Sequence, residues 1–219
     1  MTRLPDVTGI VLAGGRSARF GSPKLEADID GRPLLEHAIA AVAEVVGRII
    51  VAGSSVPDAF EDGDGDETRI DAVPDQEAFA GPLAGLAGAL EHATTRSAIV
   101  VGGDMPGLVP AVLQAMLERL AASDDFDAVL LADASGSSRR QVLPLAIDVT
   151  HASAAARHVL AGGDRSLVRL LERLRVDEVP AVEWRALDPA GRTLLDIDRQ
   201  SDVDRIRHEL RGTPFSEAR

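Results

Sequence analysis

A glycine-rich loop carrying three basic side chains follows the first apolar segment of the chain. The loop covers residues 13–24 and reads AGGRSARFGSPK. Adjacent glycines let a backbone turn tightly, and the N–H groups of such a turn can point together at an anion. The spacing is neither the Gly-x-Gly-x-x-Gly of dinucleotide-binding loops nor that of a Walker loop, which ends in Gly-Lys-Ser/Thr. The sequence therefore predicts a phosphate-binding loop of another kind.

Lys24, at the end of this loop, is the only lysine among 23 basic residues. A compact ammonium group can sit between phosphate oxygens as a point charge, whereas a planar guanidinium prefers a two-pronged hydrogen-bonded fork. A single lysine in so arginine-rich a chain thus indicates a phosphate contact that arginine cannot make. The alternative is an ordinary surface lysine, and the glycines around it favour the phosphate contact.

Asp104 follows the apolar run 98–101 through two glycines, and Pro106 comes soon after it. Ligands of open α/β sheets bind beyond the carboxyl ends of the strands, so this carboxylate is placed to face a ligand. Mg²⁺ takes one or two carboxylates beside substrate phosphates. Asp196 and Asp198, at the end of an expected strand over 194–198, are candidates for the second carboxylate, and we prefer Asp198. The alternative is that this pair only caps the helix that follows.

Asp75 marks a third strand end, where the run 70–73 gives way to Pro-Asp and then to Gly-Pro-Leu-Ala-Gly, which begins at Gly81. A carboxylate here could accept hydrogen bonds from the ring N–H and the amino group of guanine, a donor pair that adenine does not present on that edge. Asp75 would then select GTP. The alternative is an aspartate that caps a turn, a common place for Asp after Pro.

The string LAGGRSARFGSPK at 12–24 resembles the signature Leu-Ala-Gly-Gly-x-Ser-x-Arg-Met/Phe-Gly-x-x-Lys of the molybdenum cofactor guanylyltransferase family, and Gly-Pro-Leu-Ala-Gly resembles the same family. The likeness runs from residue 9 to about residue 210. Near its end the family reads Asn-x-Asn/Asp-Thr-Pro-Glu-Asp, and residues 196–202 depart from this at the Thr-Pro step. The resemblance implies that the nucleotide is held by Leu12, Ala13, Gly14 and Gly15, its phosphates by Arg19, and the transferring phosphoryl group by Lys24.

The activity that the resemblance implies is transfer of GMP from GTP to the phosphate of the molybdopterin cofactor, with Mg²⁺ and with release of pyrophosphate. Lys24, Arg19 and Asp104 would carry the catalysis, and Asp104 and Asp198 would hold the metal. Molybdoenzyme apoproteins or their chaperones are further candidate partners. Alternatives are a cytidylyltransferase for the same cofactor, a sugar-phosphate or phospholactate nucleotidyltransferase, and a non-catalytic nucleotide-binding adaptor.

A sheet must bring these distant residues together. Short β-branched runs predict strands at 9–12, 48–51, 70–73, 98–101 and 128–131. Helical periodicity at 33–46, 82–93 and 110–122 alternates with them, which favours a parallel sheet. Helix 110–122 would place one apolar face inward: Leu113, Met116, Leu117 and Leu120.

The second half of the chain changes the order of elements. Residues 128–132 and 142–147 flank a Gly/Ser-rich stretch and predict a hairpin, which would make the sheet mixed. Later elements are expected as helices at 150–160, 166–174 and 201–210 and a strand at 176–179. Together with the resemblance, the pattern predicts a Rossmann-like, three-layer nucleotidyltransferase fold of the α/β class with a mostly parallel, mixed central sheet.

Composition limits the alternatives. A length of 219 residues with 45% hydrophobic content predicts one domain, 1–211, with a disordered tail at 212–219 and a surface loop at 57–68. A formal net charge of -12 disfavours a nucleic-acid partner, and the lack of cysteine removes thiolate chemistry. No apolar stretch approaches the ~20 residues that span a bilayer, and the start lacks the features of a signal peptide. We therefore expect no membrane partner and a cytoplasmic location.

Several weaker signals remain. Arg139 and Arg140 could hold the acceptor's phosphate or could be solvated hairpin arginines, and the stretch 162–166 could begin a second anion-binding helix. The five histidines lack metal-ligand spacing and are interpreted as structural or surface residues. Trp184 is expected to pack in the core.

Overall fold

A mixed sheet forms the centre of the computed structural model, which describes residues 3–14, 24–60, 68–74, 81–132, 141–197 and 202–203. In this part of the chain seven strands pair in the order β5-β4-β1-β6-β8-β7-β9. Their bounds are β1 Leu4–Leu12, β4 Val46–Ala52, β5 Arg69–Val73, β6 Ser97–Gly102, β7 Ala128–Leu131, β8 Leu145–Asp148 and β9 Val176–Val179. The strands expected from β-branched runs are therefore confirmed.

Strand direction is parallel except at β8. β1 pairs in parallel with β4 and β6, β4 with β5, and β7 with β9, whereas β8 runs antiparallel to both β6 and β7. The predicted hairpin is confirmed, but its second strand begins at Leu145 instead of Val142. Pro144 has no backbone N–H to donate to a ladder, so the strand begins after it.

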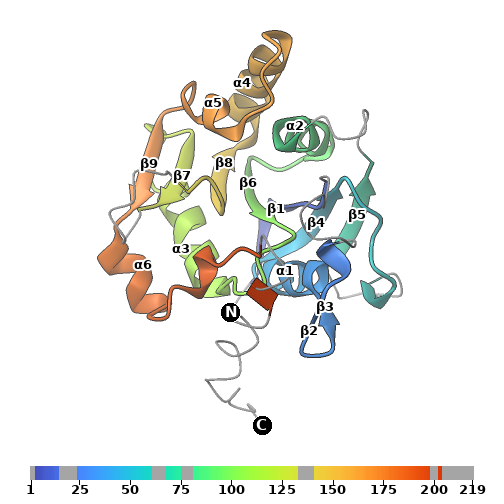
Figure 1. Cartoon of the computed structure of the whole chain (residues 1–219). Helices are drawn as coiled ribbons and strands as arrows, with labels where there is room; N and C mark the ends of the chain where they lie inside the picture. The colour runs from blue at the N-terminus through green and yellow to red at the C-terminus, as the bar shows by residue number, and fades with distance from the viewer. Residues whose placement is uncertain are drawn as a thin grey trace.

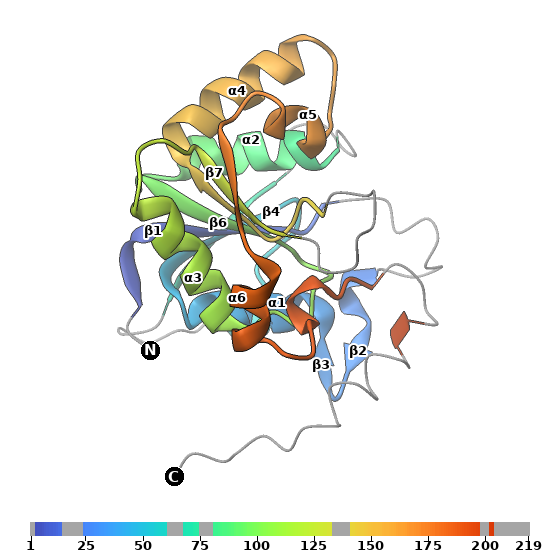
Figure 2. The ribbon, with the colours of Figure 1, turned by 90° about the vertical axis from the view of Figure 1, so that its left-hand side faces the viewer.

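Helices cover both faces of the sheet (Figure 1). Figure 2 shows α2, α4 and α5 on one side and α1, α3 and α6 on the other, so the molecule has three layers. The bounds are α1 Leu34–Ala43, α2 Pro82–His92, α3 Pro110–Ala121, α4 Val149–Ala161, α5 Leu167–Leu171 and α6 Ala181–Leu187. None of the described helices is long and apolar enough to cross a bilayer.

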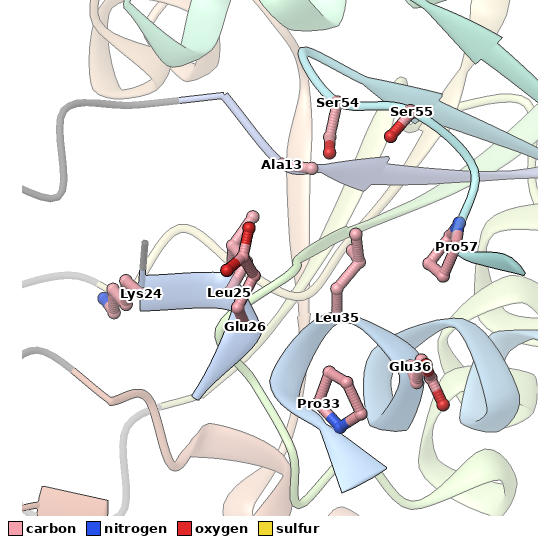
Figure 3. Close-up of a pocket in the computed structure, with 10 residues that line it drawn as sticks. All are labelled: Ala13, Lys24, Leu25, Glu26, Pro33, Leu35, Glu36, Ser54, Ser55 and Pro57. Carbon is pink, nitrogen blue, oxygen red and sulfur yellow. The ribbon is translucent and has the colours of Figure 1, made fainter. Parts of the chain in front are cut away.

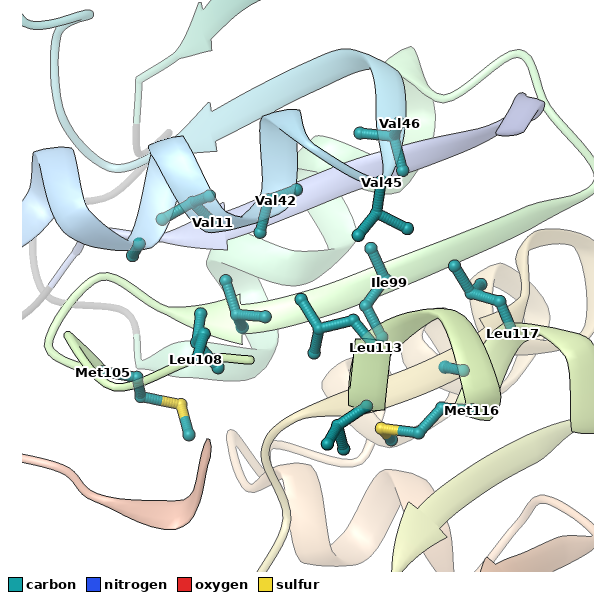
Figure 4. Close-up of a cluster of buried hydrophobic side chains, with 14 of the residues drawn as sticks. Val11, Val42, Val45, Val46, Ile99, Met105, Leu108, Leu113, Met116 and Leu117 are labelled. Carbon is teal, nitrogen blue, oxygen red and sulfur yellow. The ribbon is translucent and has the colours of Figure 1, made fainter. Parts of the chain in front are cut away.

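Alternate residues of each central strand fill the two apolar layers. In β6, Ile99 and Val101 join the layer under α1 and α3, whereas Ala98 and Val100 join the layer under α2 and α4. Burial on both faces explains why these strands read as continuous apolar runs. Figure 4 shows Leu113, Met116 and Leu117 packed toward the sheet, which confirms the predicted inner face of the helix at 110–122.

Some boundaries and elements differ from the predictions. The first helix ends at Ala43, and Val46 belongs to β4. The helix expected at 166–174 covers only Leu167–Leu171. The strand expected over 194–198 is wrong, since a 3₁₀ helix, η3 (Arg192–Leu194), precedes non-strand backbone there. The sequence pattern also missed α6 and a small hairpin of β2 (Asp28–Ile29) and β3 (Arg32–Pro33).

Other predicted segments lie partly or wholly outside the described residues. The loop expected at 57–68 contains a 3₁₀ helix, η2 (Asp58–Phe60), at its start. At its end the Thr68 hydroxyl lies 3.2 Å from the carbonyl oxygens of both Ala43 and Val46, which ties the loop to the region between α1 and β4. The hairpin loop at 133–140, most of the helix expected at 201–210 and the tail at 212–219 lie outside the described residues.

Candidate active site

The carboxyl ends of the parallel strands β1, β4 and β6 lie side by side at one end of the sheet. Leu12 is in register with Ala52 on one side and with Gly102 on the other. The N–H of Ala13 donates to the carbonyl of Ala52 at 2.8 Å, and the N–H of Gly103 donates to the carbonyl of Leu12 at 2.9 Å. The predicted nucleotide-binding residues Leu12, Ala13 and Gly14 thus adjoin the strand end that carries Asp104.

Lys24 and Asp104 meet at this end of the sheet. The Lys24 Nζ lies 2.8 Å from the Asp104 Oδ2, as an ion pair and hydrogen bond across 80 positions of sequence. The two side chains are 15% and 32% exposed. Lys24 begins a 3₁₀ helix, η1 (Lys24–Glu26), and the neighbouring Leu25 packs against the apolar layer under α1. The structure therefore brings together Lys24, which the sequence predicts to bind phosphate, and Asp104, which it predicts to bind a metal.

The segment 188–197 passes next to Asp104. The backbone N–H of Ile197 donates to the carbonyl of Asp104 at 3.1 Å, and Ile197 is fully buried. Its neighbour Asp196 is exposed, whereas Asp198 lies outside the described residues. The described residues include no group of three or more His, Asp or Glu arranged to hold a metal. The half-exposed carboxylate of Asp104 fits Mg²⁺, which keeps waters and substrate phosphates as its other ligands.

Three side chains that the sequence did not single out position this segment. Asp188, 3% exposed, accepts the backbone N–H of Thr193 at 2.7 Å, and the buried Thr193 hydroxyl accepts the N–H of Val109 at 3.2 Å. Gln141 donates from Nε2 to the carbonyl of Leu194 at 3.1 Å, which links the segment to the residues before β8. The contacts of Thr193 with Val109 and of Gln141 with Leu194 join residues far apart in sequence, so no local pattern could reveal them.

A cavity of about 320 Å³ opens beside Lys24. Figure 3 shows it between the end of β1 at Ala13, the turn after β4, and the start of α1. Its polar lining includes the hydroxyls of Ser54 and Ser55 and the carboxylates of Glu26 and Glu36. The serines were missed, although their position after an apolar strand is the same signal that identified Asp104.

Gly81 stands at the start of α2. Its φ of +91° lies in a region that L side chains rarely adopt, and the loop between α4 and α5 packs against it, with the Leu83 N–H donating to the Arg165 carbonyl at 3.3 Å. In that loop the side chains of Asp164 and Ser166 accept the N–H groups of Ser166 and Val168. Two backbone donors at the start of α5 are thus engaged within the chain, which leaves fewer of them for the second anion site expected at 162–166.

Several predicted site residues lie outside the described residues: Gly15, Arg19, Asp75, Arg139, Arg140 and Asp198. Their roles remain predictions. Trp184 packs as expected, fully buried and donating from Nε1 to the carbonyl of Ala132 at 3.0 Å. Ring nitrogens of His37 and His92 lie at hydrogen-bonding distance from the backbone carbonyls of Ile29 and Gly88, in agreement with structural roles.

Comparisons with known proteins agree with this geometry. Residues 9–179 match the family model described as MobA-like NTP transferase domain. A probable molybdenum cofactor guanylyltransferase of Chloroflexus aggregans is 31% identical over 215 residues, covering 94% of this chain and 96% of the relative. A molybdenum cofactor guanylyltransferase of Ralstonia nicotianae is 33% identical over 165 residues, covering 72% of this chain and 78% of the relative.

The fold has solved counterparts. The crystal structure of molybdopterin-guanine dinucleotide biosynthesis protein A from Archaeoglobus fulgidus aligns with a TM-score of 0.73 at 21% identity, covering 94% of this chain and 100% of that one. A 4-diphosphocytidyl-2C-methyl-D-erythritol synthase from Anaerococcus prevotii aligns with a TM-score of 0.69 at 16% identity, covering 94% and 99%. These likenesses establish the α/β nucleotidyltransferase fold, and with the family match they show that the chain belongs to the MobA-like NTP transferase family of nucleotidyltransferases.

Proposed function

We propose that this enzyme transfers GMP from GTP to the phosphate of a molybdopterin-type cofactor and releases pyrophosphate. The observation that carries the proposal is the contact between Lys24 and Asp104, 2.8 Å apart, beside the exposed start of the glycine loop at Gly14. Two relatives that cover most of the chain bear the name of this activity. The reaction belongs in the cytoplasm, with molybdoenzyme apoproteins or their chaperones receiving the product.

In the proposed reaction a phosphate oxygen of the acceptor attacks the α-phosphorus of GTP. A new P–O bond forms, the bond from the α-phosphorus to the oxygen bridging to the β-phosphate breaks, and the electron pair leaves with pyrophosphate. The acceptor phosphate is already ionised at neutral pH, so no side chain has to remove a proton. The protein's contribution is to align the reactants and to neutralise charge on the phosphates with Lys24, Arg19 and loop N–H groups.

Asp104 would hold Mg²⁺ together with Asp198, or with Asp196 in its place. The metal would supply positive charge at the phosphates, in the manner of other enzymes of phosphate transfer. The described geometry supports this assignment because the residue between the two candidates, Ile197, is hydrogen-bonded to Asp104. Replacing each candidate with alanine distinguishes them: Asp198→Ala should lose Mg²⁺-dependent turnover, and Asp196→Ala should keep most of it.

In this proposal Asp75 selects the base of the nucleotide, because its carboxylate would accept hydrogen bonds from the ring N–H and the amino group of guanine. Gly81 would let α2 begin close to the nucleotide. The fold itself does not select a base, because the chain's solved counterparts include a protein named for a cytidyl product.

Pyrophosphate release from GTP, CTP and ATP, measured with Mg²⁺ and the molybdopterin-type cofactor, tests the proposal. We expect release with GTP alone, and its loss in Asp104→Ala. Preference for CTP would identify the sister activity on the same cofactor. Absence of turnover with all three nucleotides would mean a different acceptor or a binding role.

A further inference from the structure

The proposed reaction assigns Lys24 and Asp104 to different ligands, yet the structure pairs their two side chains with each other. Lys24 is assigned to the phosphates and Asp104 to the metal, yet the Lys24 Nζ lies 2.8 Å from the Asp104 Oδ2. The other carboxylate oxygen, Oδ1, turns back against Gly102, where even an added Cβ would collide with it. The oxygen that faces away from the strand is therefore the one that Lys24 occupies.

Hydrogen bonds and packing hold the backbone of both Lys24 and Asp104 in place. The carbonyl of Lys24 accepts the N–H of Ala27 at 3.1 Å within its 3₁₀ turn, and Leu25 packs on the apolar layer beside it. The carbonyl of Asp104 is tied to Ile197, and the next residue, Met105, is only 2% exposed. Both backbones are thus fixed, and only the side chains have to move to separate the charges.

To separate, the side chains of Lys24 and Asp104 each need another charged partner. A partly buried ammonium–carboxylate hydrogen bond is stronger than a neutral one, so neither group leaves unless another charge compensates it. A divalent cation alone would have to displace Lys24 and leave its ammonium without this carboxylate. A triphosphate supplies counter-charge of its own, since its oxygens can receive Lys24 as the cation takes Asp104.

We propose that Lys24 and a divalent cation compete for the same oxygen of Asp104, so that the free enzyme binds the metal weakly and the nucleotide's triphosphate, by drawing Lys24 away, raises the affinity for the metal. This inference rests on the proposed function for two assignments, the divalent cation to Asp104 and the nucleoside triphosphate to Lys24. Linkage makes the effect reciprocal: Asp104 also restrains Lys24 from binding the triphosphate when no metal is present.

Mn²⁺ binding to the nucleotide-free enzyme tests the competition, with the free ion followed by electron paramagnetic resonance. Lys24→Met keeps the length of the side chain and removes its charge, so we expect Mn²⁺ to bind about tenfold more tightly, within the ~5–150-fold range of such couplings. Lys24→Arg keeps a cation on Asp104 and should bind Mn²⁺ as weakly as the unaltered chain. The double variant Lys24→Met/Asp104→Asn should lose the gain.

Arg32→Met is the matched control for charge. It also removes one positive charge and releases a nearby carboxylate, since Arg32 Nε lies 3.7 Å from Glu36 Oε2, but it leaves Asp104 paired. Its Mn²⁺ affinity should stay within about twofold of the unaltered chain's, because exposed charges act weakly through solvent. Unchanged or weaker Mn²⁺ binding by Lys24→Met, or an equal gain in Arg32→Met, would overturn the proposal.

The reciprocal effect, in which Asp104 restrains Lys24 from binding the triphosphate, is tested by calorimetry of GTP binding in the presence of EDTA. Asp104→Asn should bind metal-free GTP more tightly than Glu36→Gln, which removes the same charge from the cavity beside Lys24 but leaves the contact between Lys24 and Asp104 in place. Equal affinities would overturn the competition. A failure of every variant to bind GTP would count against the proposed function instead, and the Mn²⁺ result would still decide the competition.

Discussion

At the scale of single residues, the candidate site depends on the chemical type of Lys24 more than on its charge. The chain has 23 basic residues, of which this is the only lysine, and it lies against a carboxylate with 15% of its side chain exposed. An ammonium can pass from one oxygen to another by small rotations, whereas a guanidinium is larger and binds a carboxylate through a rigid fork. The group that moves between Asp104 and a phosphate must therefore be a small, mobile cation, and the ammonium of Lys24 is one.

Lys24→Arg should therefore lower kcat/KM for nucleotidyl transfer by about 100-fold, the scale of losing one charge-stabilising donor. Steady-state pyrophosphate release gives the value. Arg32→Lys, at a side chain that is 50% exposed, is the control and should remain within about threefold. Activity of Lys24→Arg close to that of the unaltered chain would contradict a specific role for the ammonium.

At the scale of elements, the strands that carry the site were predictable and the segments that join them were not. Continuous apolar runs identified β1, β4 and β6, and the rule that ligands bind at strand ends placed Lys24's loop and Asp104 at the same edge. Their direct contact requires β1 and β6 to be neighbours, which sequence pattern does not give. Alternating side chains predict a strand over 194–198, but hydrogen bonds of Asp188 and Thr193 make the segment 188–197 a turn against Val109.

Gly107→Ala tests the importance of that packing. A Cβ at position 107 would lie 2.5 Å from the backbone oxygen of Arg192, so the segment 188–197, which is hydrogen-bonded to Asp104 through Ile197, would have to move away from position 107. We expect a loss of about 2 kcal/mol in the free energy of unfolding, typical of overpacking, and a reduced kcat/KM. Denaturant unfolding and pyrophosphate release measure the two effects.

Gly47→Ala is the control for this substitution, because an added Cβ there has nothing within 4 Å. Its unfolding free energy and activity should match those of the unaltered chain. If Gly107→Ala behaved like Gly47→Ala, the close approach of the segment to Gly107 would have no role in stability or catalysis.

At the scale of the whole molecule, an ion pair between the starts of two strands stabilises the half of the sheet that lies far from Lys24. Asp127, just before β7, accepts from the Arg175 side chain at 2.7 and 3.0 Å and from its backbone N–H at 2.9 Å. The Arg175 guanidinium, together with that N–H, holds the pKa of Asp127 below its ordinary value even though burial opposes this. The contact joins the start of β7 to the start of β9, so its loss should weaken the whole edge.

Asp127→Asn should lower the free energy of unfolding by about 2 kcal/mol at pH 7, the scale of hydrogen bonds to a buried charge. Because the folded-state pKa is lowered, this stability is present above the unfolded-state pKa of about 3.9 and is lost as the pH falls through the folded-state value. The difference between the two chains should therefore shrink between about pH 5 and pH 3. Urea unfolding at pH 7 and pH 3 measures it.

Asp124→Asn is the comparison for that experiment. Its carboxylate pairs with Arg96, and both side chains are largely exposed, at 88% and 74%. The substitution should change the unfolding free energy by less than about 0.5 kcal/mol at either pH. A pH-independent effect of Asp127→Asn would show that its ionised form does not stabilise the fold.

In the proposed reaction the α-phosphate of GTP passes to the acceptor, and the fate of two radioactive labels tests this transfer most directly. GTP labelled at the α-phosphate and GTP labelled at the γ-phosphate would each be incubated with Mg²⁺, the molybdopterin-type cofactor and the enzyme. We predict that the α label appears in the dinucleotide form of the cofactor and the γ label in pyrophosphate, in equal amounts. Appearance of the γ label on the acceptor or as inorganic phosphate, with the α label left in GDP, would contradict the claim.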